Sequence, residues 1–243
     1  MNLALKIAKR YLLSKKSTNA INIIGGVSVL GMIVGTMALL LVLSVFNGFE
    51  DLVKSLYNTF NPDLRIEAKV GKVFVPDSLQ LIQLKKIDGV KAVSLILEEN
   101  ALLQYKEKDY ISRLKGVDDN YNLVSAIDTA IIDGKYQLTD GAINHALFGV
   151  SVEAALGVNI RNTFTSVKVF MPKRAMAVKY MAPEKAFVQA ALYPNGVFAI
   201  QQDFDSKYTI VPLRFMRELL EYDKEVSALE LAIHPDANAT KIE

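Results

Sequence analysis

The 243-residue sequence contains no cysteine and only two histidines. Without cysteine the chain has no disulfide, no thiolate nucleophile and no thiolate ligand for zinc or an iron–sulfur cluster. His145 and His234 each lack a second histidine three or four residues away that would complete a metal-binding helical face. Acidic pairs such as Glu98-Glu99 are typical of solvated turns, and on a strand their side chains face opposite ways. We therefore expect no metal site.

Nucleotide-binding and catalytic motifs are also absent. The sequence has no G-x-x-x-x-G-K-[ST] phosphate loop, no G-x-G-x-x-G after a strand and no G-x-S-x-G nucleophile elbow. With 28 basic and 26 acidic residues, its formal net charge is only +2, which gives no field of the kind that binds nucleic acid. We expect no enzyme activity, no cofactor and no nucleic-acid partner.

The charges are unevenly distributed along the chain. Residues 1–49 hold five bases and no acid, whereas residues 50–243 hold the other 23 bases and all 26 acids, a net charge of −3. The first 49 residues are thus a basic, apolar head on a mildly acidic body. The five bases of the head are Lys6, Lys9, Arg10, Lys15 and Lys16.

An uncharged run of 33 residues, 17–49, dominates the head, and residues 21–46 include 15 Leu, Ile, Val or Phe. As a helix, 21–46 would be roughly 39 Å long, enough to cross a hydrocarbon core of about 30 Å with some tilt. The apolar periodicity continues beyond this run until Pro62 ends it. We predict a membrane helix with a stalk over residues 20–60.

A cleaved secretory signal is the alternative to this membrane helix, because bases followed by an apolar segment are also its pattern. The apolar run is, however, about twice as long as a usual signal core, and no small-x-small cleavage site follows it. We therefore predict a retained signal anchor. Since all five bases precede the span, the positive-inside rule places the N-terminus in the cytoplasm and residues from about 50 onward on the other side.

Two further features of the head indicate contacts at the membrane. Residues 1–19 combine apolar residues at i, i+4 spacing with bases elsewhere, which predicts an amphipathic interfacial helix on the cytoplasmic surface; a frayed basic flank is the alternative. Gly31 and Gly35 form a small-xxx-small pair that lets another helix approach closely, although glycine is common in membrane helices. We predict helix packing at these two glycines.

Residues 61–243 mix strand-like and helix-like periodicity, which predicts an α+β domain. No second apolar run of spanning length is present in the sequence, so we expect the chain to cross the membrane once. The expected strands cover 64–68, 90–105, 110–117, 165–171, 197–201, 208–211 and 226–234, and the expected helices cover 78–87, 151–157 and 212–222.

One stretch of the body has an unusual charge balance. The 30 residues between Glu153 and Glu184 contain five bases and no acid, together with three of the seven methionines. Bases with soft apolar side chains suit a surface that docks an acidic or apolar partner. The alternative is a long β-hairpin whose methionines fill the core and whose lysines are solvated. The candidate docking residues are Met171, Lys173, Arg174, Met176, Lys179 and Met181.

Several segments occur in an order that resembles a known family. The most specific is Ser44-Val45-Phe46-Asn47-Gly48-Phe49 at the end of the apolar run, and residues 61–66 follow it. Residues 149–158, 204–213 and 227–236 extend the likeness over essentially the whole chain. The sequence resembles the permease subunits of the lipoprotein-releasing (Lol) transporter, which belong to the wider MacB-like and FtsX-like ABC permease group.

The resemblance implies a span in the inner membrane, a MacB-like periplasmic domain, a separate cytoplasmic ATPase and a second permease subunit, identical or different. It also implies extraction of lipoproteins from the membrane and their transfer to a periplasmic carrier. Val42, Val45, Phe46 and Phe49 would then line the outer-leaflet end of a cavity for acyl chains. Residues 171–195 lie where one Lol permease carries a hairpin hook that holds the carrier, although no hook motif matches residue for residue.

Two other functions fit the same residues. The first alternative is a mechanotransmission or cell-division permease of the same superfamily, which acts on an envelope partner. The second is a single-span anchor that displays an interaction domain. Gly31 and Gly35 speak against a passive anchor. Family members carry three further spans after the periplasmic domain, so we expect this sequence to be a fragment of a longer permease.

Overall fold

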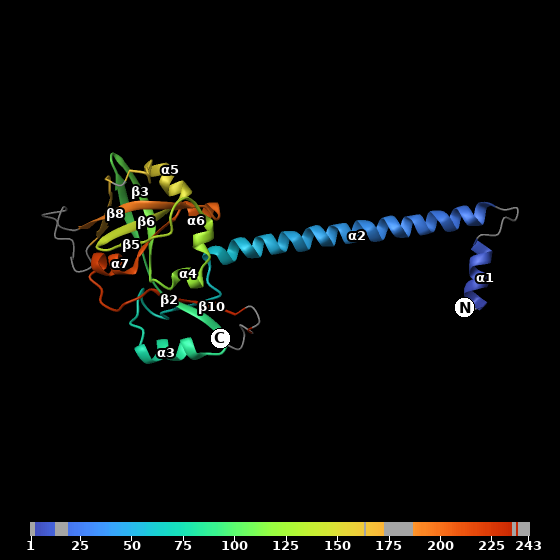
Figure 1. Ribbon diagram of the computed structural model, residues 1–243, viewed down its shortest axis with the longest axis horizontal. Coiled ribbons are helices and arrows are strands. Elements are labelled where there is room, and N and C mark those ends of the chain that lie inside the picture. Colours follow the sequence, from blue (N-terminus) through green and yellow to red (C-terminus); the bar gives the residue numbers. More distant parts are fainter. Residues whose placement is uncertain (1–2, 13–18, 163, 173–186, 235–236, 238–243) are drawn as a thin grey trace. The chain divides into compact units, whose positions relative to one another are not determined.

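The chain forms two compact units, Met1–Lys54 and Ser55–Glu243. The first unit is helical, and the second contains all the strands of the described residues (Figure 1). The computed structural model describes residues 3–12, 19–162, 164–172, 187–234 and 237.

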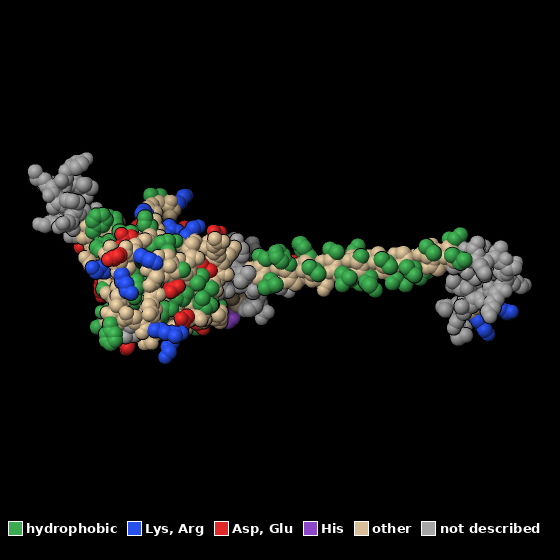
Figure 2. Space-filling view, turned by 90° about the horizontal axis from the view of Figure 1, so that it is seen from above, with side chains coloured by type: hydrophobic (Ala, Val, Ile, Leu, Met, Phe, Trp, Pro, Cys, Tyr) green, Lys and Arg blue, Asp and Glu red, His purple; other side chains and the backbone are tan. Residues whose placement is uncertain are grey.

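The first unit contains α1 (Leu3–Leu12) and most of α2 (Asn19–Phe60). Within α2, Ile23–Glu50 is long and apolar enough to cross a membrane, with a mean hydropathy of 2.6, and no other helix of the described residues meets the same criterion. Hydrophobic side chains are exposed along this helix (Figure 2), as expected of a helix surrounded by lipid. Helix α2 continues without a break to Phe60, two residues before Pro62.

The second unit is built on a mixed sheet with the strand order β1-β10-β2-β3-β9-β6-β8-β4. Strand β7 pairs with β2 and β8, and β5 pairs with β6. The β3–β9 and β6–β8 pairs are parallel, and the others are antiparallel. The strands are β1 (Leu64–Glu67), β2 (Val90–Tyr105), β3 (Lys108–Val117), β4 (Ile131–Gly134), β5 (Thr139–Asp140), β6 (Ile143–Gly149), β7 (Val167–Pro172), β8 (Phe187–Phe198), β9 (Tyr208–Pro212) and β10 (Ala228–Ile233).

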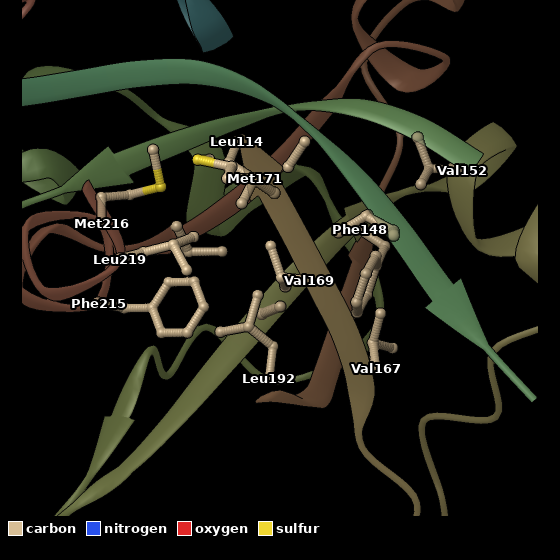
Figure 3. Close-up of a cluster of buried hydrophobic side chains, with 14 of the residues drawn as sticks. Leu114, Phe148, Val152, Val167, Val169, Met171, Leu192, Phe215, Met216 and Leu219 are labelled. Atoms are coloured by element: carbon tan, nitrogen blue, oxygen red, sulfur yellow. The ribbon is translucent and has the colours of Figure 1, made fainter. Parts of the chain in front are cut away.

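Some of these pairings close a ring. Strand β2 pairs with β3, β3 with β9, β9 with β6, β6 with β8 and β8 with β7, and β7 returns to β2. Side chains from the ring strands converge on one core, in which Leu114, Phe148, Val169 and Leu192 are fully buried (Figure 3). The ring is therefore a small barrel whose interior is filled by side chains.

Two helices add apolar side chains to the barrel core. Helix α7 (Leu213–Leu220) packs on β2, β3 and β9 and contributes Phe215 and Met216, whereas α5 (Val150–Leu156) packs against β3, β6 and β8. Helix α5 ends at Gly157, whose φ of 66° is the left-handed conformation that glycine adopts without strain.

A second core lies on the opposite face of the sheet. Because neighbouring strand residues point to opposite faces, Leu97 lies in the barrel core while Ile96 lies in the second core. Tyr121 and Ile127, from short helices, cover this second core. The remaining helices are α3 (Ser78–Lys86), α4 (Tyr121–Val124), the 3-10 helix η1 (Ile127–Ala130) and α6 (Gln202–Asp205).

The α+β class and most of the expected elements are confirmed. Strand β2 covers the expected residues 90–105, and β1, β3, β7, β9, β10, α3, α5 and α7 overlap their expected ranges to within a few residues. The expected strand 197–201 is wrong, because β8 ends at Phe198 and begins at Phe187. No element was expected within residues 119–149, where the structure contains α4, η1, β4, β5 and β6.

Candidate functional site

A group of charged side chains lies where β1, β10, β2 and β3 are adjacent. Each strand contributes one member, Arg65 from β1, Glu230 from β10, Glu98 from β2 and Lys115 from β3. Strand pairing brings them together, because Arg65 stands opposite Glu230 and Glu98 stands opposite Lys115. We call these four residues the charge cluster.

Lys115 and Glu230 form the buried half of the charge cluster. Lys115 Nζ donates to both carboxylate oxygens of Glu230, at 2.9 and 3.0 Å, and the two side chains are 1% and 0% exposed. Lys115 Nζ also lies 4.9 Å from the ring centroid of Tyr121, within range of a cation–π contact. Buried charges are tolerated when they are paired and hydrogen-bonded, so these contacts keep both ions inside the domain.

Arg65 and Glu98 form the half of the charge cluster that is nearer the surface. Arg65 Nη1 donates to Glu230 at 2.7 Å and to Glu98 at 3.1 Å. The Arg65 side chain is 31% exposed, whereas the side chain of Glu98 is 7% exposed. The backbone N–H of Glu98 donates to Ser227 Oγ at 2.6 Å, which fixes this part of β2. Two cations face two anions, so the charge cluster is neutral.

Burial by itself would lower the pKa of both cations, but their partners reverse the effect. For Arg65, burial is outweighed by Glu98 and Glu230, which raise the pKa above its usual value. For Lys115, burial is outweighed by Tyr121, Glu230 and Glu98, and the pKa is raised as well. Both cations are therefore charged at neutral pH, and full charges hold the cluster together.

A further polar contact fixes the start of β1. The backbone N–H of Ile233 in β10 donates to Asp63 Oδ2 at 2.7 Å. Asp63 and Arg65 flank Leu64, the first residue of β1, so polar contacts to β10 hold the strand on both sides of its first residue.

A pocket of about 250 Å³ opens beside the charge cluster. Its charged lining consists of three bases and three acids, and these groups already pair with one another, as in the 3.1 Å contact between Lys72 and Glu99. The pocket therefore has no surplus charge with which to hold an ion. Among the described residues, no group of three or more His, Asp or Glu side chains suits a metal. The charge cluster is a structural connection between strands.

The residues that the sequence assigns to the membrane lie on the surface of α2. Gly31 and Gly35 lie one turn apart on α2, the small-xxx-small spacing that allows two helices to approach closely. The predicted cavity residues have the spacing i, i+3, i+4 and i+7, which places them on one face of the helix. These residues, all exposed, are Val42, Val45, Phe46 and Phe49.

Strands β7 and β8 form the described part of the hairpin considered in the sequence. They pair antiparallel from Val167 opposite Leu192 to Pro172 opposite Phe187. Met171 faces the barrel core and is 1% exposed, so its assignment to a docking surface is wrong and the core-filling alternative holds for this residue. The other candidates, Lys173, Arg174, Met176, Lys179 and Met181, lie outside the described residues.

Sequence reasoning did not find the charge cluster. The available signal is a lone charge inside an apolar strand, such as Glu230 between Leu229 and Leu231. A lone acid in such a place needs a cation, but only the strand register identifies that cation as Lys115.

The apolar helix and the mixed sheet-and-helix domain define a membrane-anchored protein with an α+β domain. The family model described as the MacB-like periplasmic core domain matches residues 26–243. The chain therefore belongs to the MacB-like periplasmic core domain family, which is found in the permeases of ABC-type transporters.

Individual relatives agree with this assignment. The lipoprotein-releasing system transmembrane protein LolC of Neisseria meningitidis serogroup B is 26% identical over 241 residues, which cover 96% of this chain and 55% of that protein. The chain thus spans about half the length of this curated relative.

Two solved structures are also similar. The extracellular domain of the ABC-type transporter YknZ from Gram-positive bacteria has a TM-score of 0.50 at 14% identity, covering 74% of this chain and 88% of that one. The periplasmic region of MacB from Actinobacillus actinomycetemcomitans has a TM-score of 0.47 at 14% identity, covering 69% and 70%. The likeness to YknZ shows the fold of the domain.

Proposed function

We propose that the chain is the membrane-anchored part of a lipoprotein-releasing ABC permease. In this role a separate cytoplasmic ATPase drives extraction of lipoproteins from the inner membrane and their transfer to a periplasmic carrier. The observation that carries the proposal is the match to a lipoprotein-releasing relative over 96% of the chain, within a family of permeases. The chain itself would be a non-catalytic subunit that converts motion into release.

The proposed orientation follows from the charges around the span. All five bases of residues 1–49 lie on the amino side of the apolar run, and no acid offsets them. The positive-inside rule then puts α1 in the cytoplasm and the domain in the periplasm. In α1, apolar and basic residues suit a helix that lies on an anionic membrane surface.

The exposed face of α2 near its outer-leaflet end would receive the acyl chains. Val42, Val45, Phe46 and Phe49 share one face and offer apolar surface without a charge. Gly31 and Gly35 lie further toward the cytoplasmic end and leave space for a helix of the second permease subunit, identical or different. The acyl-chain face and the glycine pair would together form one side of a cavity between two subunits.

The hairpin that begins with β7 and β8 would hold the periplasmic carrier. Residues 173–186 join these two strands and include the basic residues Lys173, Arg174 and Lys179. Bases beside methionines suit an acidic or apolar docking surface. Exchanging Lys173 and Arg174 for Glu should abolish pull-down of the carrier, whereas the same exchange at Lys85 and Lys86 of α3, a matched pair elsewhere on the domain, should not.

A mechanotransmission permease that acts on an envelope partner is the second candidate, because the family and the YknZ-like fold serve it equally well. A single-span anchor is a third candidate, which the small-xxx-small spacing of Gly31 and Gly35 disfavours.

Photo-crosslinking distinguishes lipoprotein release from these two alternatives. A photoreactive residue at position 46 of the complete permease should capture the acylated end of a lipoprotein. The same residue at position 40, on the opposite side of α2, should not. Equal or absent capture at both positions would exclude lipoprotein handling by this face.

A further inference from the structure

The connection between the membrane helix and the domain is short. Helix α2 ends at Phe60, and β1 begins at Leu64, so residues 61–63 alone join them. Any displacement of α2 therefore reaches the domain first through β1. If the proposed function holds, β1 is the point at which the motion driven by the ATPase enters the domain.

By its backbone alone, β1 is a weak attachment. It has four residues, it stands at the end of the strand order, and among the described residues it pairs with β10. Short edge elements with exposed hydrogen bonds open locally at little cost in free energy. A strand of this kind would separate from the sheet under load before it moved the barrel.

Side-chain contacts strengthen this attachment. Asp63 accepts the Ile233 N–H at 2.7 Å, and Arg65 donates to Glu230 at 2.7 Å. Glu230 is fully buried and is also bound by Lys115 of β3, a strand of the barrel. The contacts from Arg65 through Glu230 to Lys115 thus connect the edge strand to the barrel through side chains, in addition to the backbone pairing of β1 with β10 and of β10 with β2.

We propose that Asp63 and Arg65 form a lock that keeps β1 paired with β10 throughout the ATPase cycle, so that movement of α2 displaces the barrel as a rigid body. Arg65 is a positioning residue in this mechanism. When Arg65 is replaced, Lys115 still binds Glu230, and Arg113 Nε still lies 3.9 Å from the carboxylate of Glu98, so each buried acid keeps a cation.

The test uses the complete permease with its partner subunit and ATPase in lipid vesicles. Ile66 and Leu229 are opposite one another in β1 and β10, and this chain has no native cysteine, so I66C/L229C gives a single pair within reach of a short thiol cross-linker. The lock predicts equal cross-linking yield without nucleotide and during ATP hydrolysis. In a D63A/R65Q background, where position 63 has no side-chain oxygen to accept the Ile233 N–H, the yield should fall only while ATP is hydrolysed.

Release of a model lipoprotein is the second readout. D63A/R65Q should reduce release by about five- to tenfold with ATP hydrolysis unchanged, and cross-linking positions 66 and 229 through I66C/L229C in that background should restore release. Two results would overturn the proposal by showing that β1 must separate. In the first, the cross-linking yield falls during hydrolysis although Asp63 and Arg65 are intact. In the second, cross-linking with a disulfide-forming reagent stops release until a reductant cleaves the link. Constant cross-linking with no lipoprotein release from the parent complex would instead refute the proposed function and leave the lock intact.

Discussion

Lys115 on β3 holds both carboxylate oxygens of Glu230 on β10, at 2.9 and 3.0 Å, although 115 residues separate them in the sequence. Neither side chain is more than 1% exposed. This pair joins the barrel to the strand next to β1, so its strength determines how firmly the edge of the sheet is connected to the barrel core.

Replacing Lys115 or Glu230 alone should destabilise the domain more than replacing both residues. K115M or E230Q leaves a buried charge without its main partner and should lower the free energy of unfolding by about 3–5 kcal/mol. K115M/E230L replaces both ions with apolar groups and should cost less than either single change. Denaturant unfolding of the chain in detergent, as a double-mutant cycle, measures this. Additive losses would contradict a coupled pair.

Alkaline pH should weaken the domain through the same pair. The pKa of Lys115 is raised in the folded protein, so its stabilising contribution is complete below the unfolded lysine value of about 10.4 and is lost as pH rises through the folded value. Between about pH 10.5 and pH 12 the parent should therefore lose more thermal stability than K115M/E230L. Parallel losses in the two proteins would assign the alkaline transition to other groups.

Met171 should behave as a core residue. It is 1% exposed among the barrel side chains, so M171A should lower the free energy of unfolding by about 2–5 kcal/mol through lost contacts and a cavity. K168A, at an exposed position of the same strand, should change it by less than about 0.5 kcal/mol. A mild effect of M171A, comparable to that of K168A, would return Met171 to the docking surface.

The glycine pair of α2 should govern assembly with the second permease subunit. G31L/G35L fills the space that a partner helix needs and should reduce co-purification of that subunit. S44L adds the same side chain on the opposite side of α2 and serves as the control. Equal co-purification of the two variants would place the subunit contact elsewhere.

Local sequence signals were sufficient where an element is decided by its own residues. The uncharged apolar run predicts the long helix from its length and composition alone. The strand-like residues 90–105 predict β2 to the residue. Strand β8 shows the limit. Pro194, Asn195 and Gly196 are typical of a turn, yet here they continue a strand, because parallel pairing with β6 accommodates them through a shift in register.

The charge cluster was beyond prediction for a related reason. Arg65, Glu98, Lys115 and Glu230 are each unremarkable in sequence, and only the order and register of four strands place them together. The same holds for Met171. Its place in a basic stretch favoured a surface, whereas the direction of its side chain on β7 puts it in the core.

The most direct test of the account is ATP-dependent release of a model lipoprotein from vesicles that contain the complete permease, its partner subunit and its ATPase, with a soluble carrier outside. We predict that ATP moves the lipoprotein from the membrane to the carrier, and that the transfer is lost in F46A but not in L40A. ATP hydrolysis at the normal rate with no lipoprotein released would contradict the account.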